Sequence, residues 1–115
     1  GVPAMTILRT THSLVGVLTL VLLLSAVRSE LRIALNAVDS PSLALLIPVL
    51  AFAGLVTAIT SALTAIVVDM AALVLLVLYM VGNGGDALTL TGVVGLCIMA
   101  GLCVGLIRFD RKTGD

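Results

Sequence analysis

Asp69 is the residue of this sequence best suited to chemistry, because it is the only charged side chain between residues 43 and 81. A carboxylate at membrane depth costs roughly 3 kcal/mol or more unless it is protonated, paired or solvated. One interpretation is an intramembrane relay for protons or ions. The other is a structural carboxyl, paired with a basic group of another subunit or hydrogen-bonded to Thr57, Thr60, Ser61 or Thr64. Ion pathways usually contain several polar groups in series, which favours the structural interpretation of this isolated residue.

His12, Cys97 and Cys103 are the nitrogen and sulfur side chains that could bind a metal ion. His12 could also bind haem or pass a proton, but it is the only histidine and precedes the first apolar run. We therefore expect it to be a capping residue or a polar residue at the level of the lipid headgroups. The spacing of the two cysteines on a helix directs them about 240° apart, so they neither form a disulfide nor make a metal site alone. The sequence predicts no metal ion and no cofactor.

Other catalytic patterns are missing from the sequence. It contains no CxxC, HExxH or GxSxG motif, no glycine-rich loop followed by Lys-Ser or Lys-Thr, and no pair of carboxylates on one helical face. Residues 82–86, GNGGD, lack the preceding strand and the following cation of a phosphate-binding loop, so we interpret them as a turn. We expect a protein that is not an enzyme. The net charge of zero also excludes a nucleic-acid-binding surface.

The composition indicates an integral membrane protein. The chain has 115 residues, of which 61% are hydrophobic and 10% charged, and its mean hydropathy is +1.33. A soluble domain of this size buries only about two-thirds of its surface, too little to hide so much apolar surface from water. We therefore predict a single transmembrane helical domain over residues 1–115, in contact with the lipid bilayer.

Four transmembrane helices account for the apolar runs. Residues 43–81 would form about 58 Å of helix, nearly twice the roughly 30 Å of a bilayer core. They must fold back, and the polar pair Thr60-Ser61 lies near the middle. The predicted all-α fold has helices at about 10–28, 42–60, 62–81 and 87–107. Both termini then lie on one side of the membrane, and the distribution of Lys and Arg favours the inside.

An amphipathic connector is predicted at residues 28–38, because Leu31, Leu35 and Val38 recur at helical spacing among charged residues. It would lie at the membrane interface, either as a docking helix for a partner or as a hydrated linker. Ser40 and Pro41 provide a start signal for the next helix. Pro48 follows within that helix and is a possible kink.

Small residues spaced for close helix packing occur in two places. Gly54 and Ala58 form one small-xxx-small pattern, and Gly101 and Gly105 form another. Such patterns let helix backbones approach closely in lipid, where helices gain no hydrophobic stabilisation from each other. We predict that these four residues pack helices against each other or against other membrane subunits, with self-association as one of the options.

Residues 62–79, the glycine loop and the apolar run after it resemble, in texture, the small helical subunits of multi-subunit cation/proton antiporters and respiratory complexes. Four-helix membrane scaffolds share this texture. We predict a non-catalytic accessory or scaffold subunit of a larger membrane complex, because the chain is small, lacks a catalytic constellation and carries small-residue packing faces and an amphipathic connector. The likeness in texture makes a respiratory or other energy-transducing complex one option. The alternative is an ion- or proton-conducting subunit of a transporter, with Asp69 as its intramembrane relay.

Overall fold

The computed structural model describes residues 4–36 and 43–113, with the side chains of residue 34 and residues 111–113 excepted. The described chain is helical and contains no strand, which confirms the all-α prediction. Its elements, in order, are α1 (Ala4–Ala26), α2 (Arg28–Asn36), the 3₁₀ helix η1 (Leu43–Leu45), α3 (Leu46–Thr57), α4 (Ala62–Asn83) and α5 (Ala87–Thr113).

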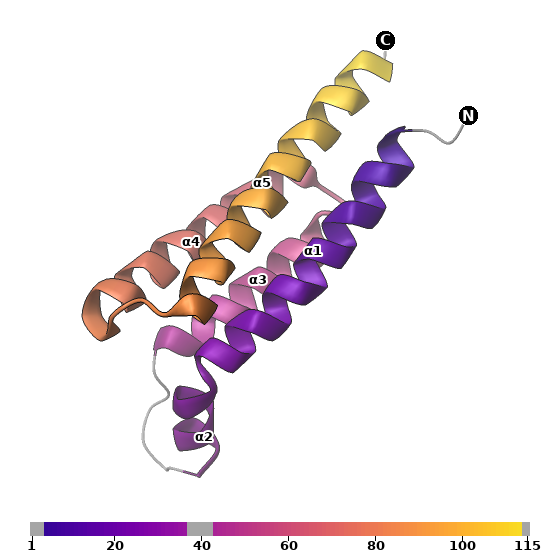
Figure 1. The fold of residues 1–115 in the computed structure, drawn as a ribbon. Coiled ribbons are helices and arrows are strands. Elements are labelled where there is room, and N and C mark those ends of the chain that lie inside the picture. Colours follow the sequence, from indigo (N-terminus) through magenta and orange to yellow (C-terminus); the bar gives the residue numbers. More distant parts are fainter. Residues whose placement is uncertain (1–3, 37–42, 114–115) are drawn as a thin grey trace.

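Helices α1, α3, α4 and α5 form an elongated bundle in which each packs against two of the others, in the circular order α1, α3, α4, α5. Neighbouring helices run antiparallel (Figure 1). The start of α1, the α3–α4 turn and the end of α5 lie at one end, which we call the terminal end. Helix α2 and the α4–α5 loop lie at the opposite, or loop, end. The two ends of the bundle are therefore formed by different turns and helix termini.

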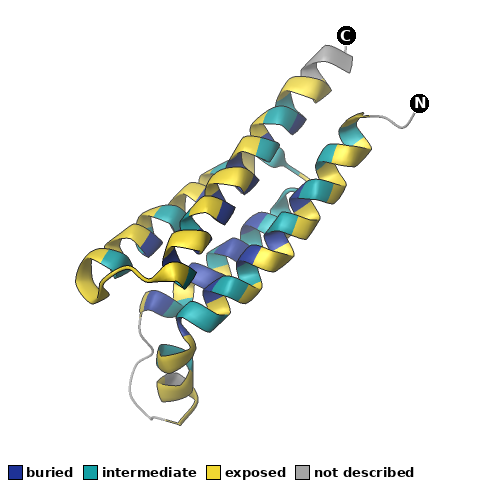
Figure 2. Cartoon of the chain, viewed as in Figure 1, coloured by how far each residue is buried: buried dark blue, intermediate teal, exposed yellow. Residues whose placement is uncertain are grey.

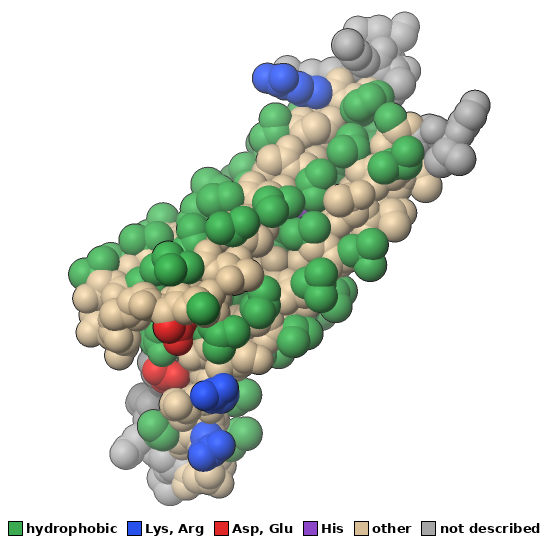
Figure 3. Space-filling view, in the orientation of Figure 1, with side chains coloured by type: hydrophobic (Ala, Val, Ile, Leu, Met, Phe, Trp, Pro, Cys, Tyr) green, Lys and Arg blue, Asp and Glu red, His purple; other side chains and the backbone are tan. Residues whose placement is uncertain are grey.

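Three helices are long and apolar enough to cross a membrane: Ala4–Ala26, Ala62–Asn83 and Ala87–Asp110. The apolar segment Leu43–Thr57 is shorter, about 22 Å against the roughly 30 Å of a bilayer core. Apolar side chains cover the length of the bundle on the face seen in Figure 3, and charged side chains lie toward its ends. This pattern is consistent with a multi-pass membrane protein.

Several helix boundaries in the structure differ from the predicted ones. Helix α1 begins at Ala4 rather than near residue 10, because Met5, Ile7 and Leu8 extend its apolar surface. Helix α3 ends at Thr57, and α5 continues past residue 107 to Thr113. The predicted fold-back near Thr60-Ser61 is present, where the Ser61 hydroxyl accepts a hydrogen bond from the Thr64 N–H at 3.2 Å. Ser61 thus marks the start of α4 as an N-cap.

Pro48 has a different effect on its helix from the one predicted. Ser40, Pro41 and Val38 lie outside the described residues. Pro48 lies in the first turn of α3, just after the 3₁₀ turn. In that turn a backbone N–H has no partner within the helix, so the missing N–H of proline breaks no helical hydrogen bond. Pro48 therefore does not kink the middle of a helix, contrary to the prediction.

The predicted connector is a separate helix, α2, which follows α1 after a break at Val27. Ile33 and Leu35 on it are 64% and 77% exposed within the chain. A tie to the bundle comes from the Tyr79 hydroxyl on α4, which donates a hydrogen bond of 2.8 Å to Glu30 Oε1. The connector thus presents apolar side chains outward while one acid links it to α4.

The apolar core lies toward the loop end, between α1, α3, α4 and α5 (Figure 2). Its residues have at most 1% of their surface exposed; they are Leu23, Ile47, Ala51, Ala72, Leu76, Leu96 and Met99. A Cβ atom on Gly92 would lie 2.8 Å from the Leu23 side chain, and one on Gly95 would collide with Thr19. These glycines let α1 and α5 pack closely.

Candidate intramembrane ion site

Three helices bring His12, Asp69 and Cys103 together inside the bundle. These residues come from α1, α4 and α5. Their nitrogen, oxygen and sulfur ligand atoms all lie within 4.8 Å of one another. The Cys103 Sγ atom is 3.4 Å from His12 Nε2. The exposed fractions of the three residues are 2%, 0% and 0%, respectively. The cluster is thus a compact polar site within apolar surroundings.

Helical periodicity directs Asp69 into the interior. The buried residues of α4 are Ala65, Asp69, Ala72 and Leu76, which share one face at spacings of three and four. Two of these four are alanines, which leave space beside the carboxylate. From α3, Gly54 faces the same point, because a Cβ atom built there would collide with Asp69 Oδ1. The absence of a side chain at Gly54 therefore makes room for the carboxylate.

The Asp69 carboxylate has no hydrogen-bond partner among the described residues, although both of its oxygens are buried. The hydroxyls expected to bind it are engaged locally. Thr57 donates to the Gly54 carbonyl, Thr60 donates to the Thr57 carbonyl, and the Thr64 hydroxyl donates to Ser61 Oγ. The predicted hydroxyl partners of Asp69 are therefore wrong. A buried polar group without a partner is costly and calls for an explanation.

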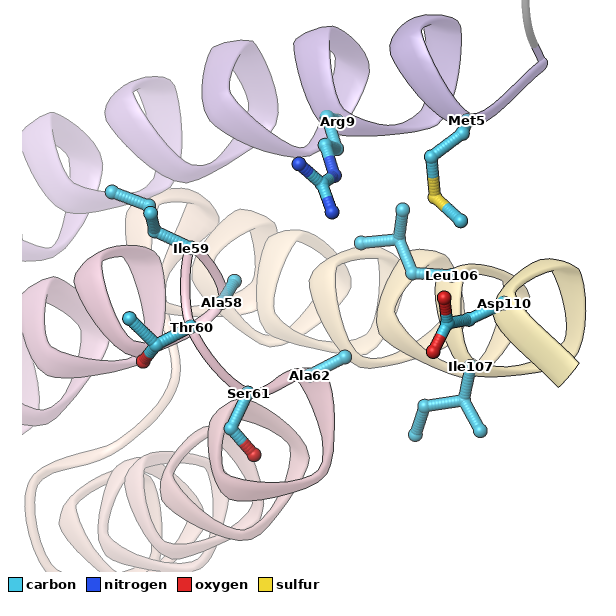
Figure 4. Close-up of a pocket in the computed structure, with 10 residues that line it drawn as sticks. All are labelled: Met5, Arg9, Ala58, Ile59, Thr60, Ser61, Ala62, Leu106, Ile107 and Asp110. Carbon is cyan, nitrogen blue, oxygen red and sulfur yellow. The ribbon is translucent and has the colours of Figure 1, made fainter. Parts of the chain in front are cut away.

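A cavity lies beside His12, between α1 and the C-terminal end of α3. It has a volume of about 230 Å³, and His12, Ser13 and Arg9 are among its lining residues. A second cavity of about 350 Å³ lies next to it and shares Arg9, Ala58, Ile59 and Leu106 with it. Figure 4 shows the Arg9 side chain extending from α1 into this space, opposite the α3–α4 turn. His12 thus borders a cavity on the terminal side of the cluster, lined by both polar and apolar side chains.

Toward the loop end the same helices are closely packed. Along α1, α4 and α5, the buried residues on this side of the site include Leu23, Leu76 and Met99, each 0% exposed. Thr19, which is 2% exposed, is the polar side chain buried among them on α1. The cavities at Arg9, at His12 and at Glu30 do not join the cluster to this end of the bundle. The cavity beside His12 therefore lies on the terminal side of the cluster, and the packed core lies on the other side.

The placement of His12 differs from the prediction. His12 is not a capping residue, because α1 begins two turns earlier, and its side chain is buried, with 2% of its surface exposed. It shares the interior face of α1 with Gly16, Thr19 and Leu23. That face of small and polar residues is the signal by which the sequence could have shown that His12 points inward. Its meeting with Cys103 depends on helix packing.

The predicted packing residues fall in different environments. Gly54 faces Asp69, and Ala58 lines both cavities. Gly105 faces Leu8 of α1, whose nearest side-chain atoms would lie 3.7 Å from a Cβ. Gly101 is exposed, with no atom within 4 Å of such a Cβ. The first pattern thus borders the site, whereas Gly101 lies on the outer surface of α5.

A second polar contact lies at the loop end. There Glu30 Oε2 is buried without a partner among the described residues, although Oε1 accepts the Tyr79 hydrogen bond. Glu30, Tyr79 and Asn83 line a cavity of about 310 Å³. The apolar core lies between this contact and the His12 cluster, so the described residues form no continuous polar path between the two regions.

Comparison with known proteins yields no match, neither to a family model nor to a curated protein nor to a solved structure. The site is therefore interpreted from its own chemistry.

Proposed function

We propose that this chain is a multi-pass subunit of a larger membrane complex and that it binds a cation in transit at Asp69. The observation that carries the proposal is the fully buried Asp69 carboxylate, which has no partner among the described residues and lies beside two further electron-pair donors. A negative charge in a low-dielectric interior attracts a cation strongly. The arrangement of His12, Cys103 and Asp69 supplies the several polar groups that an ion site needs.

Access favours ion handling over a purely structural role. A structural carboxyl is expected to be hydrogen-bonded to its surroundings, and the nearby hydroxyls of α3 and α4 are bonded elsewhere. The cavity at His12 gives a route from the terminal end. The packed side chains toward the loop end, such as Leu76 and Met99, close the opposite route. Transfer across the membrane therefore requires another subunit or a rearrangement of this core.

The topology of the proposed subunit has four crossings with both termini inside. The segment Leu43–Thr57 would be the fourth crossing, because α3 runs antiparallel to α1 and α4 along the bundle. Basic residues at the terminal end, Arg9 and Arg108 with residues 111–112 of the tail, outnumber Arg28 and Arg32 of the connector. This bias favours the terminal end inside. The cavity would then open toward that side.

A flux measurement on the purified complex tests the proposal. The tagged chain is isolated with its partners in mild detergent and reconstituted into vesicles, and movement of protons and metal cations is followed. We expect Asp69→Asn to lower the flux of the transported ion to that of protein-free vesicles while the subunit composition is retained. Asp86→Asn, which changes an acid in the exposed α4–α5 loop, is the matched control and should leave flux unchanged.

Two outcomes would contradict the proposal. Unchanged flux in the Asp69→Asn complex would remove the ion-handling role. A wild-type chain that purifies as a stable monomer without partners would remove the larger complex.

The second candidate function is a scaffold without ion handling. The outer surface of α5 favours it, because Gly101 there is exposed and has open space around it, next to the apolar side chains of Ile98 and Val104. A close-approaching partner helix would fit such a surface. This role predicts that Gly101→Leu removes a partner from the complex while Asp69→Asn has no effect.

A further inference from the structure

We propose that His12, Asp69 and Cys103 form a three-ligand site for a divalent transition-metal ion of the zinc class, with a fourth coordination position left for water or an exchanging ligand. The inference deepens the proposed function, on which it rests, by specifying which cation Asp69 binds. Its basis is the convergence of imidazole, carboxylate and thiol from three helices. The unpartnered and fully buried carboxylate is an independent observation that points to a ligand.

The geometry fits a single ion. In a tetrahedral zinc site with Zn–S near 2.3 Å and Zn–N near 2.0–2.1 Å, the sulfur and nitrogen lie about 3.6 Å apart. The Cys103 Sγ to His12 Nε2 distance is 3.4 Å. The carboxylate oxygen of Asp69 lies within 4.8 Å of both of these atoms. Small adjustments of side-chain torsions therefore suffice to bring all three donors onto one ion.

The charge balance selects a divalent ion. Metal ligation requires the thiolate of Cys103, the carboxylate of Asp69 and neutral His12. These ligands carry two negative charges together, so one divalent cation makes the buried site neutral. The protons of the thiol and of the carboxyl leave as the metal binds, toward the cavity beside His12. A monovalent ion held by the same thiolate, carboxylate and neutral imidazole would leave a net negative charge in the apolar interior, which is unfavourable.

The donor atoms select the metal class. Calcium and magnesium require six or more oxygen ligands, whereas this site offers one sulfur, one nitrogen and a carboxylate. Thiolate and imidazole together favour zinc and similar borderline metals. Structural zinc sites are closed by four protein ligands, but sites that exchange ligands have three and an open position. His12 also lines the cavity, which provides space for water next to the site.

Cobalt(II) binding to the purified chain in detergent tests the inference. Cobalt substitutes for zinc and gives a thiolate-to-metal charge-transfer absorption that identifies sulfur ligation. We expect one equivalent of Co²⁺ to give this absorption and one equivalent of Zn²⁺ to displace it. Cys103→Ser should remove the band, and His12→Ala and Asp69→Asn should each lower the apparent affinity at least about tenfold.

The matched control is Cys97→Ser, the same substitution on the same helix at an exposed cysteine. It should keep the band and the affinity. Circular dichroism and elution volume identify variants that have not folded, and these are replaced by the milder Cys103→Ala or His12→Gln. A band that survives in folded variants at position 103, or one that depends on Cys97, would overturn the assignment.

Failure of this inference is distinguishable from failure of the proposed function. If the folded wild-type chain binds neither Co²⁺ nor Zn²⁺ while Asp69→Asn still abolishes flux of another ion through the complex, the metal assignment is wrong and the ion-handling role remains. If flux is unaffected by Asp69→Asn, the proposed function is wrong whether or not the chain binds cobalt.

Discussion

The two halves of the bundle differ although the same four helices, α1, α3, α4 and α5, build both. In the terminal half, a His, an Asp and a Cys face one another beside cavities. In the loop half, Leu23, Leu76 and Leu96 pack with no exposed surface. Close packing stabilises helix association in lipid, where the hydrophobic effect between helices is absent. The loop half therefore holds the bundle together. This stability allows the terminal half to retain buried polar groups, which lower the free energy of unfolding.

The largest effect should come from placing an acid in the loop half. Leu76→Asp introduces a carboxylate where no donor cluster or cavity accommodates it, because Leu76 belongs to the fully buried apolar core. We expect a loss of about 3 kcal/mol or more in the free energy of unfolding, measured by denaturant titration in mixed micelles. Leu76→Met is the control and should cost less than about 1.5 kcal/mol. Equal stability of the two variants would show that the halves do not differ as described.

A smaller effect is expected at the start of α5. Thr89 N–H donates to Asp86 Oδ1 at 2.9 Å, and Asp86 N–H donates to the Thr89 hydroxyl at 2.9 Å, which closes a reciprocal cap. Asp86→Ala removes the side-chain half of this cap. We expect a modest fall in the unfolding temperature at neutral pH, smaller than that caused by Leu76→Asp.

The same cap should depend on pH. The hydrogen bonds from Thr89 to the Asp86 carboxylate lower the pKa of Asp86 below its ordinary value. Because the pKa is lower in the folded state, the stabilisation is complete above the unfolded value of about 3.9 and is lost as the pH falls through the lowered value. The wild type should therefore approach the stability of Asp86→Ala in acid. A difference that stays constant with pH would contradict this assignment.

The smallest change in metal-free stability should follow Asp69→Asn. The amide has nearly the shape of the carboxyl, and the carboxyl has no partner among the described residues to lose. We expect the free energy of unfolding without metal to change by less than about 1 kcal/mol. Added Zn²⁺ should raise the unfolding temperature of the wild type more than that of the variant. A ligand stabilises the folded state more when it binds that state more tightly, and the variant lacks one ligand of the metal. Equal stabilisation by zinc would place the metal elsewhere.

Much of the fold was predictable from local sequence signals. Apolar runs predict the helices, residues 82–86 predict the loop, and Thr60-Ser61 predicts the fold-back, which Ser61 caps. The start of α1 at Ala4 was missed because charged Arg9 interrupts the apolar pattern near its beginning. In the structure Arg9 borders a cavity instead of ending the membrane segment.

The site was predictable only in part. Asp69 is conspicuous in an apolar run, and its burial agrees with its position on the helix. The roles of His12 and Cys103 depend on the pairing of α1 with α5, which local periodicity does not specify. A histidine and a cysteine that are far apart in the chain carry no mutual spacing signal, unlike the closely spaced ligands of a zinc finger.

The short length of α3 has a consequence for the surrounding lipid. In the proposed four-crossing topology, Leu43–Thr57 falls short of the hydrocarbon thickness, so the bilayer would thin beside it and headgroups and water would dip toward the α3–α4 turn. The electric field across the membrane would then be concentrated over the packed loop half. In the proposed ion-handling role, an ion that reaches His12 would cross little of the membrane voltage, and the main voltage-dependent step would be its passage beyond Asp69.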